Sequence, residues 1–306
     1  MSNFKYLLLS ILLFSFSCNE NREYDLISKY SSSTNSVNFI NPYEQVGVEH
    51  NILMTEFVRL FDSIRTNQSI DTLGYPLEMK NWVLPIIRTT FYNIYPEATF
   101  STQTFDSVYN EMEIISYLDN NGSYEFMFNQ AKDYIDVYAT NKDSIYTMNF
   151  LNDIKSLLDN YEGETDILVD FLGIINQHEA VILNEQWDST ESFSLGIIAV
   201  AKHSCQFWQQ YFAQSPTVSD KHQFYFIQET KKDPKKGIEK GVVVASDAVG
   251  SIVGSIEGAM IGSGISPVAG TIRGYYVGKV VGAVSASSSA LAVIELIDWW
   301  KKIGEW

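Results

Sequence analysis

The sequence predicts an all-α protein, a helical bundle followed by a helical hairpin. Apolar residues recur every three or four positions from residue 43 to about 230, which is the spacing of one helix face. Glycines recur every four positions in a second segment near the C-terminus. Strand signals are scarce, since the one Asn-Gly pair joins helix-like segments instead of β-branched runs.

The segment from 43 to 230 divides into a series of amphipathic helices, which together form the acidic part of the chain. Pro85 lies inside one of them and should kink or split it, because proline lacks the amide proton that a helix interior needs. The expected helices cover approximately 47–66, 76–95, 103–119, 123–140, 144–160, 164–187, 192–212 and 219–230.

The C-terminal hairpin is predicted from two runs of glycine at four-residue steps. Residues four apart share one face of a helix, so each run gives a helix with a bare stripe. Glycine weakens a helix interior by about 1 kcal/mol relative to alanine, and close packing of one backbone on another is the expected compensation. Ser266-Pro267 suits the start of the second helix. The glycines expected to pack are Gly250, Gly254, Gly258 and Gly262 in the first run, and Gly270, Gly274, Gly278 and Gly282 in the second.

Four charged residues of the hairpin lie at matching depths when counted from its turn. Glu257 is level with Arg273, and Asp247 lies within one turn of Lys279, so we expect the charges to pair across the hairpin. A membrane-spanning helix needs about 20 mostly apolar residues. Because only nine uncharged residues separate Asp247 from Glu257, simple insertion of two spans by a monomer is not expected. Insertion as a paired hairpin or as an oligomer stays open.

Composition separates an acidic body from a weakly basic end. The 306 residues carry a net charge of −16, of which residues 231–306 contribute +2 and the preceding part −18. Nucleic-acid binding needs a dense basic patch, so nucleic acid is not an expected partner.

The N-terminus reads as an export signal, with Lys5 followed by an apolar run that ends at Cys18. A small residue before this cysteine resembles the lipobox of bacterial lipoproteins, although Ser15-Phe16-Ser17 replaces the usual triplet. The resemblance implies a signal peptide over 1–17, acylation of Cys18 and, from the following Asn19, passage to the outer membrane, on a face that the sequence does not specify. A plain secretory signal is the alternative.

Composition shifts mark the remaining boundaries. Residues 18–42 are polar and suit a lipidated tether, and 43–230 is the acidic α-helical domain. Residues 231–237 hold four lysines with proline and glycine, which suits a linker before the hairpin segment 238–306. The C-terminal end of the hairpin segment combines tryptophans with lysines, a composition typical of a membrane interface. The residues expected at that interface are Trp299, Trp300, Lys301, Lys302 and Trp306.

Two stretches resemble known groups of proteins. The glycine runs of 241–292 look like the glycine-zipper hairpins of bacteriocin-like peptides and of some outer-membrane lipoproteins, which implies membrane association or self-assembly. The segment Asn-Pro-Tyr-Glu-Gln-Val-Gly-Val-Glu-His-Asn, residues 41–51, is similar to one found near the start of uncharacterised bacterial lipoproteins. Neither resemblance implies a catalytic residue.

The sequence carries no recognised catalytic or phosphate-binding motif. His178 and Glu179 with Glu185, and His203 with Cys205, are the only local pairings with conceivable metal or nucleophile chemistry, and structural roles are expected for them. We therefore expect no enzymatic activity, no cofactor and no metal site.

Three functions are compatible with these observations. The first is a non-enzymatic envelope lipoprotein whose hairpin mediates membrane association or self-assembly, with membrane lipid as its partner and a homo-oligomer left open. The second is a secreted antibacterial or pore-forming toxin that inserts the hairpin. The third is a hairpin packed on the helical domain as core, with no role at a membrane.

Overall fold

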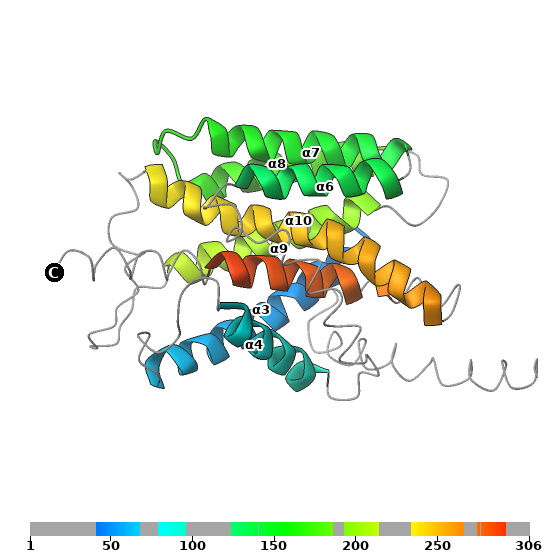
Figure 1. Cartoon of the computed structure of the whole chain (residues 1–306). Helices are drawn as coiled ribbons and strands as arrows, with labels where there is room; N and C mark the ends of the chain where they lie inside the picture. The colour runs from blue at the N-terminus through cyan, green and yellow to red at the C-terminus, as the bar shows by residue number, and fades with distance from the viewer. Residues whose placement is uncertain are drawn as a thin grey trace, which may run out of the picture. The chain divides into compact units, whose positions relative to one another are not determined.

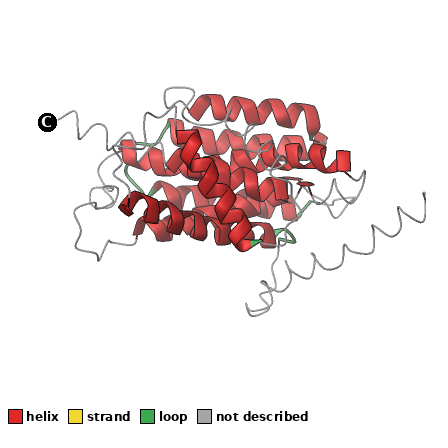
Figure 2. Ribbon diagram, turned by 60° about the horizontal axis from the view of Figure 1, so that its bottom comes forward, coloured by secondary structure: helices red, strands yellow, loops and turns green. Residues whose placement is uncertain are grey.

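The computed structural model confirms the all-α prediction: the residues it describes form eight helices and no strand (Figures 1 and 2). Residues 41–306 make up one compact unit, distinct from residues 1–40. The expected helices 103–119 and 219–230 lie outside the described residues. The structure describes residues 41–67, 79–95, 124–139, 141–185, 193–213, 234–265, 274–275 and 277–291.

The helices of this unit are arranged in three layers (Figure 1). α6, α7 and α8 form an outer layer, and α3 with α4 forms the opposite one. Between them lie α9, α10 and the last described helix, drawn in red in Figure 1. The bounds are α3 Glu44–Asn67, α4 Met79–Ile94, α6 Tyr124–Tyr138, α7 Asn141–Asp159, α8 Ile167–Leu183, α9 Phe193–Ala213, α10 Pro234–Ile265 and the last helix Val277–Leu291.

Local sequence signals explain how α8 begins and which face it buries. Gly163 takes a positive φ of 83° in the preceding turn, a backbone conformation that favours glycine. The side chain of Asp166 then accepts a hydrogen bond of 3.1 Å from the amide of Leu168, which caps the helix N-terminus. The buried side chains follow at helical spacing: Ile167, Leu168, Phe171, Ile175, His178 and Ile182.

α4 continues through Pro85, so the proline does not split this helix. The proline ring lies on the exposed side of the helix, and the buried side chains Val83, Ile86 and Ile87 flank it. Thr89 donates a hydrogen bond of 2.8 Å to the Pro85 carbonyl oxygen. Burial of the opposite face therefore outweighs the roughly 3 kcal/mol that an interior proline costs.

α10 begins at Pro234, inside the segment 231–237 that the sequence suggested as a linker. Proline suits the first position of a helix, because its missing amide proton has no partner there in any case. Gly237 is already buried against the ring of Tyr161. The end of this segment is thus the first turn of α10, and α10 packs on α6, α7, α8 and α9 within the same compact unit.

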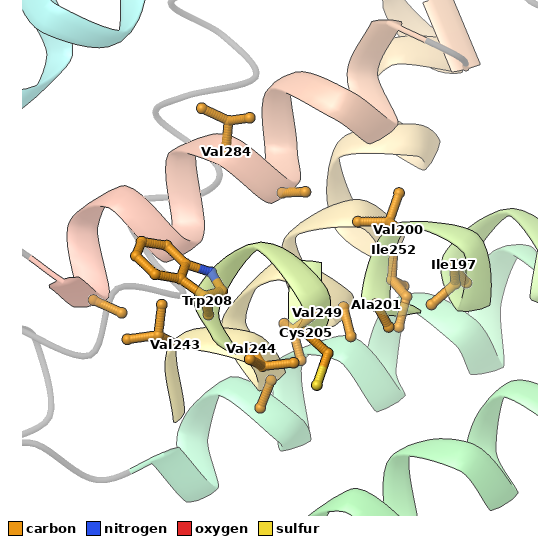
Figure 3. Close-up of a cluster of buried hydrophobic side chains, with 14 of the residues drawn as sticks. Ile197, Val200, Ala201, Cys205, Trp208, Val243, Val244, Val249, Ile252 and Val284 are labelled. Atoms are coloured by element: carbon orange, nitrogen blue, oxygen red, sulfur yellow. The ribbon is translucent and has the colours of Figure 1, made fainter. Parts of the chain in front are cut away.

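The centre of the core lies where α9 and α10 face one another (Figure 3). Trp208 of α9 is fully buried and is the largest side chain of this group. The α10 residues around it are β-branched or small, a composition that lets two helices approach closely. The labelled side chains of this cluster are Ile197, Val200, Ala201, Cys205 and Trp208 from α9, Val243, Val244, Val249 and Ile252 from α10, and Val284 from the last helix.

Candidate functional site

The glycines of α10 lie against the glycines of the last helix, backbone to backbone. A Cβ atom built on Gly254 would lie 2.7 Å from the Cα of Gly282 and nearer still to the carbonyl oxygen of Gly278. One built on Gly258 would lie 2.8 Å from the Cα of Gly278 and would overlap the carbonyl oxygen of Gly274. Gly250 meets Gly282 in the same way. Real Cβ atoms do not approach backbone so closely, so these positions accept only glycine without a shift of the helices.

For two of the eight glycines expected to pack, the structure does not describe the surroundings. Gly262 belongs to α10, but the surroundings of its side-chain position are outside the described residues, and so is Gly270 altogether. The structure therefore brings together Gly250, Gly254 and Gly258 with Gly274, Gly278 and Gly282.

Asp247 of α10 is fully buried and joins three donors from two other helices. Its Oδ1 lies 2.9 Å from Nε2 of His50 in α3. Its Oδ2 accepts a hydrogen bond of 3.0 Å from the indole Nε1 of Trp208 and a short one from the hydroxyl of Ser204, both in α9. A buried carboxylate is tolerated when several donors satisfy it, so this cluster fixes α10 to α3 and α9.

The imidazole of His50 faces an oxygen acceptor at each ring nitrogen. Nε2 faces Asp247, and Nδ1 lies 3.0 Å from Oδ1 of Asn51. The amide of Asn51 is oriented by its own bond, since Nδ2 donates to the carbonyl oxygen of His203 at 2.9 Å. Both ring nitrogens of His50 therefore have a polar partner, and the ring is held between Asn51 and Asp247.

Asp247 and Lys279 do not pair, in contrast to the expectation from their depths along the hairpin. The carboxylate of Asp247 is bonded to His50, Ser204 and Trp208 instead. The expectation considered the hairpin alone, whereas the closest donors come from helices that precede it in the chain.

Lys279 is fully buried in the last helix, inside a cage of aromatic rings. Its Nζ lies 4.2 Å from the ring centroid of Tyr275, and 5.6 Å and 5.8 Å from those of Phe193 and Tyr43. Nζ also donates a hydrogen bond of 2.6 Å to the hydroxyl of Tyr275. Gly196 of α9 closes the cage, because a Cβ at that position would overlap Nζ.

Burial sets the protonation of Lys279. Removal from water disfavours the ammonium and lowers its pKa from 10.5 to about 7, although the nearby Asp143 carboxylate opposes this shift. Between these two values the folded protein binds fewer protons than the unfolded chain. The free energy of unfolding is therefore highest above pH 10.5, where Lys279 is neutral in both states, and it decreases as the pH falls toward 7. Cation–π contacts with the rings offset part of the loss.

Replacing Lys279 by methionine is expected to raise the free energy of unfolding at pH 7 by about 2 kcal/mol, because an apolar side chain of similar length needs no desolvation of charge. The wild-type chain should also gain up to about 1.4 kcal/mol per pH unit between pH 7 and 9, and the variant should not. Urea unfolding at both pH values measures these differences.

The matched control for this prediction is Lys155→Met, which removes a partly exposed pair with Asp159. It should change stability by less than about 1 kcal/mol. Equal pH dependence of stability in the wild-type chain and in Lys279→Met would contradict the assignment.

The start of the folded unit is fastened to α8 and α9 by a buried polar cluster. Glu44 pairs with Lys202 and His203, and Lys202 also pairs with Glu179 at 2.9 Å. Burial alone would raise the pKa of Glu44, but hydrogen bonds from His203 and Lys202 outweigh it and hold that pKa below 4.5. Asn41 donates from Nδ2 to Glu179 at 2.9 Å.

Glu257, the other described member of the two charge pairs expected across the hairpin, accepts a hydrogen bond of 2.8 Å from the hydroxyl of Tyr134 in α6. Its expected partner Arg273 lies outside the described residues, as do the lipidation candidate Cys18 and the signal and tether segments. The expected interfacial residues Trp299, Trp300, Lys301, Lys302 and Trp306 lie outside them too.

The two pairings with conceivable chemistry have separate structural surroundings. His178 bonds Asp153 at 2.7 Å, and His203 belongs to the cluster around Glu44. Burial raises the pKa of the Cys205 thiol to about 12, so the reactive thiolate is disfavoured there. Within the described part of the chain, no group of three or more His, Cys, Asp or Glu side chains is placed to hold a metal ion.

The sequence did not reveal the pairing of His50 with Asp247, or the roles of Ser204, Trp208 and the aromatic rings around Lys279. One signal was present: Asp247 and Lys279 are isolated charges in apolar, glycine-rich helices, and such charges need buried partners. The identity of those partners depends on the tertiary arrangement. The pattern alone does not contain it.

One described helix, over Gly237–Met260, is long and apolar enough to cross a membrane by length and composition, and 89% of its most apolar window is buried inside the protein. The core helix of a soluble protein passes the same test. Comparison with known proteins gives no match to a family model, to a curated protein or to a solved structure.

Proposed function

We propose that this chain is a non-enzymatic bacterial envelope lipoprotein that stores a membrane-active glycine-zipper hairpin inside a helical bundle. In the closed state the hairpin contacts protein, and it contacts lipid only after the bundle opens. The observation that carries the proposal is that a stretch of spanning length, with a mean hydropathy of 1.4, is enclosed by other helices.

The hydroxyl groups of α10 support passage of this helix into lipid. Ser246, Ser251 and Ser255 are buried, and each donates to a carbonyl oxygen of α10 itself, three or four residues earlier, at 2.7–2.8 Å. Hydroxyls bonded within their own helix need no partner from the bundle. Transfer of α10 into an apolar solvent therefore leaves these groups satisfied.

The glycine contact supports movement of the two helices as a pair. Because Gly254 and Gly278 pack on one another within the chain, this face is already occupied. Self-assembly through the same glycine face would require the hairpin to separate first. We therefore propose that any oligomer of the closed protein uses another surface.

The second candidate is a hairpin that stays in the core permanently, and the cluster around Asp247 favours it. Release of α10 breaks three buried bonds of this carboxylate and leaves the charge to be neutralised in lipid. The two candidates differ in one measurable property, the binding of lipid when the bundle is opened.

Flotation with anionic vesicles tests the proposal on a Cys18→Ser background, which removes the expected acyl chains. The wild-type bundle should remain unbound in plain buffer. It should float with the vesicles in sub-denaturing urea, and the Asp247→Leu variant should float without urea, because both treatments free the hairpin.

The matched control is Asp247→Leu combined with Val253→Glu, which places a charge on the apolar surface of α10. Loss of flotation in this double variant assigns the binding to the hairpin. If the opened protein fails to float, the hairpin is permanent core. If flotation persists in the double variant, another surface binds lipid. Release of dye from the same vesicles would favour the toxin interpretation over simple association.

A further inference from the structure

Residues 41–44 lie where the folded unit begins, and their Tyr43 places its ring 5.8 Å from the buried Nζ of Lys279. We propose that this segment, here named the clasp, is a latch: it seals Lys279 from water, and its displacement uncovers the last helix while the rest of the bundle stays folded. This inference deepens the proposed function, on which its biological meaning rests, by naming what controls exposure of the hairpin.

The clasp is held by hydrogen bonds and ion pairs to α8 and α9. Asn41 is 1% exposed, and its Nδ2 donates to Oε1 of Glu179 and, at 3.1 Å, to the carbonyl oxygen of Leu195. Its Oδ1 accepts the amide of Tyr43 at 2.9 Å, which fixes the turn that aims the tyrosine ring. Glu44 anchors the other end through its pairs with α9.

The same turn of α9 that receives the clasp also forms the cage. Leu195 accepts the bond from Asn41, and its neighbour Gly196 lies directly against Nζ of Lys279. Phe193, two residues earlier, contributes one of the rings. Loosening the bond between Asn41 and Leu195 therefore loosens two walls of the cage at once.

The hydrogen-bonding capacity of Lys279 explains why exclusion of water by the clasp has a consequence. An ammonium has three donors, and within the described structure the one hydrogen-bond acceptor of Nζ is the hydroxyl of Tyr275. The charged group that faces it from α7 is Asp143, whose carboxylate already accepts bonds from the amide and hydroxyl of Ser194. Water admitted to the cage would satisfy the remaining donors. Opening of the clasp is thus coupled to hydration of Lys279.

Amine labelling with an acetylating ester, read by mass spectrometry at pH 8, tests the latch in the absence of lipid. Lys279 should resist labelling in the wild-type chain. Asn41→Ala should raise the labelling rate of Lys279 at least tenfold, because it removes three bonds of the clasp. Glu44→Gln gives a second, milder opening, since an amide keeps the shape of the side chain and loses its charge.

Lys240 is the internal reference, because it is 8% exposed and lies over the ring of Phe212. A tenfold rise at Lys279 with Lys240 unchanged supports a local latch. A parallel rise at both lysines means global opening and overturns it, as does an unchanged rate at Lys279 in both variants. Tyr124→Phe, which removes a bond to Asp159 elsewhere, should alter neither lysine. Because the labelling experiment contains no lipid, a negative labelling result would overturn the latch and would not affect the flotation test of the proposed function. A negative flotation result would likewise not affect the labelling test.

Discussion

Replacing Gly254 by alanine is expected to lower the free energy of unfolding by about 1–2 kcal/mol. The added Cβ would overlap the carbonyl oxygen of Gly278 and lie 2.7 Å from the Cα of Gly282. Both are backbone atoms, so no side-chain rotation relieves the overlap and the two helices must separate. Overpacking of this kind typically costs 1–3 kcal/mol, and the better helix propensity of alanine offsets only about 1 kcal/mol. Equilibrium denaturation in urea measures the change.

Gly173→Ala is the matched control, because this glycine also lies inside a helix but has no atom within 4 Å of the position of a Cβ. Here the propensity gain acts alone, and stability should rise by about 0.5–1 kcal/mol. The two identical substitutions should therefore have opposite signs. A stabilising effect at both positions would show that α10 and the last helix are not in backbone contact.

Replacing Asp247 by leucine is expected to cost about 3–5 kcal/mol. The change leaves the His50 imidazole, the Ser204 hydroxyl and the Trp208 indole without their buried partner. Asp247→Asn should cost less, because its carbonyl oxygen still accepts from one or two of these donors. Thermal and urea unfolding of the three proteins gives the comparison.

A double-mutant cycle separates this pair from its surroundings. His50→Leu and Asp247→Leu should each be strongly destabilising, whereas the double variant should be more stable than the sum of the two predicts, because no charge is then left buried alone. A coupling energy near zero would contradict direct pairing of His50 with Asp247.

The amphipathic helices of the bundle could be predicted from sequence, because their burial pattern is local. The described helices α3, α6, α7, α8 and α9 lie within a few residues of their expected positions. α4 continues through Pro85, since the exposed side of a helix tolerates the proline when the other side is buried. Such compensation comes from tertiary packing and cannot be predicted from the local sequence pattern around Pro85.

The position of α10 could not be predicted, because the interior of a protein and the interior of a membrane select similar side chains. The run of small and β-branched residues in α10 suits either solvent. The isolated charges Asp247 and Lys279 were visible, but apart from Tyr275 their partners come from α3, from α9 and from Tyr43, far away in the sequence. The expected pairing of Asp247 with Lys279 considered the hairpin alone and did not take into account the helices that surround it.

Hydrogen exchange of the intact chain in buffer, resolved by mass spectrometry, tests the central claim that α10 and the last helix form one stored pair in the core. The account predicts that amides of 234–265 and 277–291 are among the slowest to exchange and that both segments open with the same free energy. Exchange of 277–291 well before 234–265, or of both before α3 and α9, would contradict it.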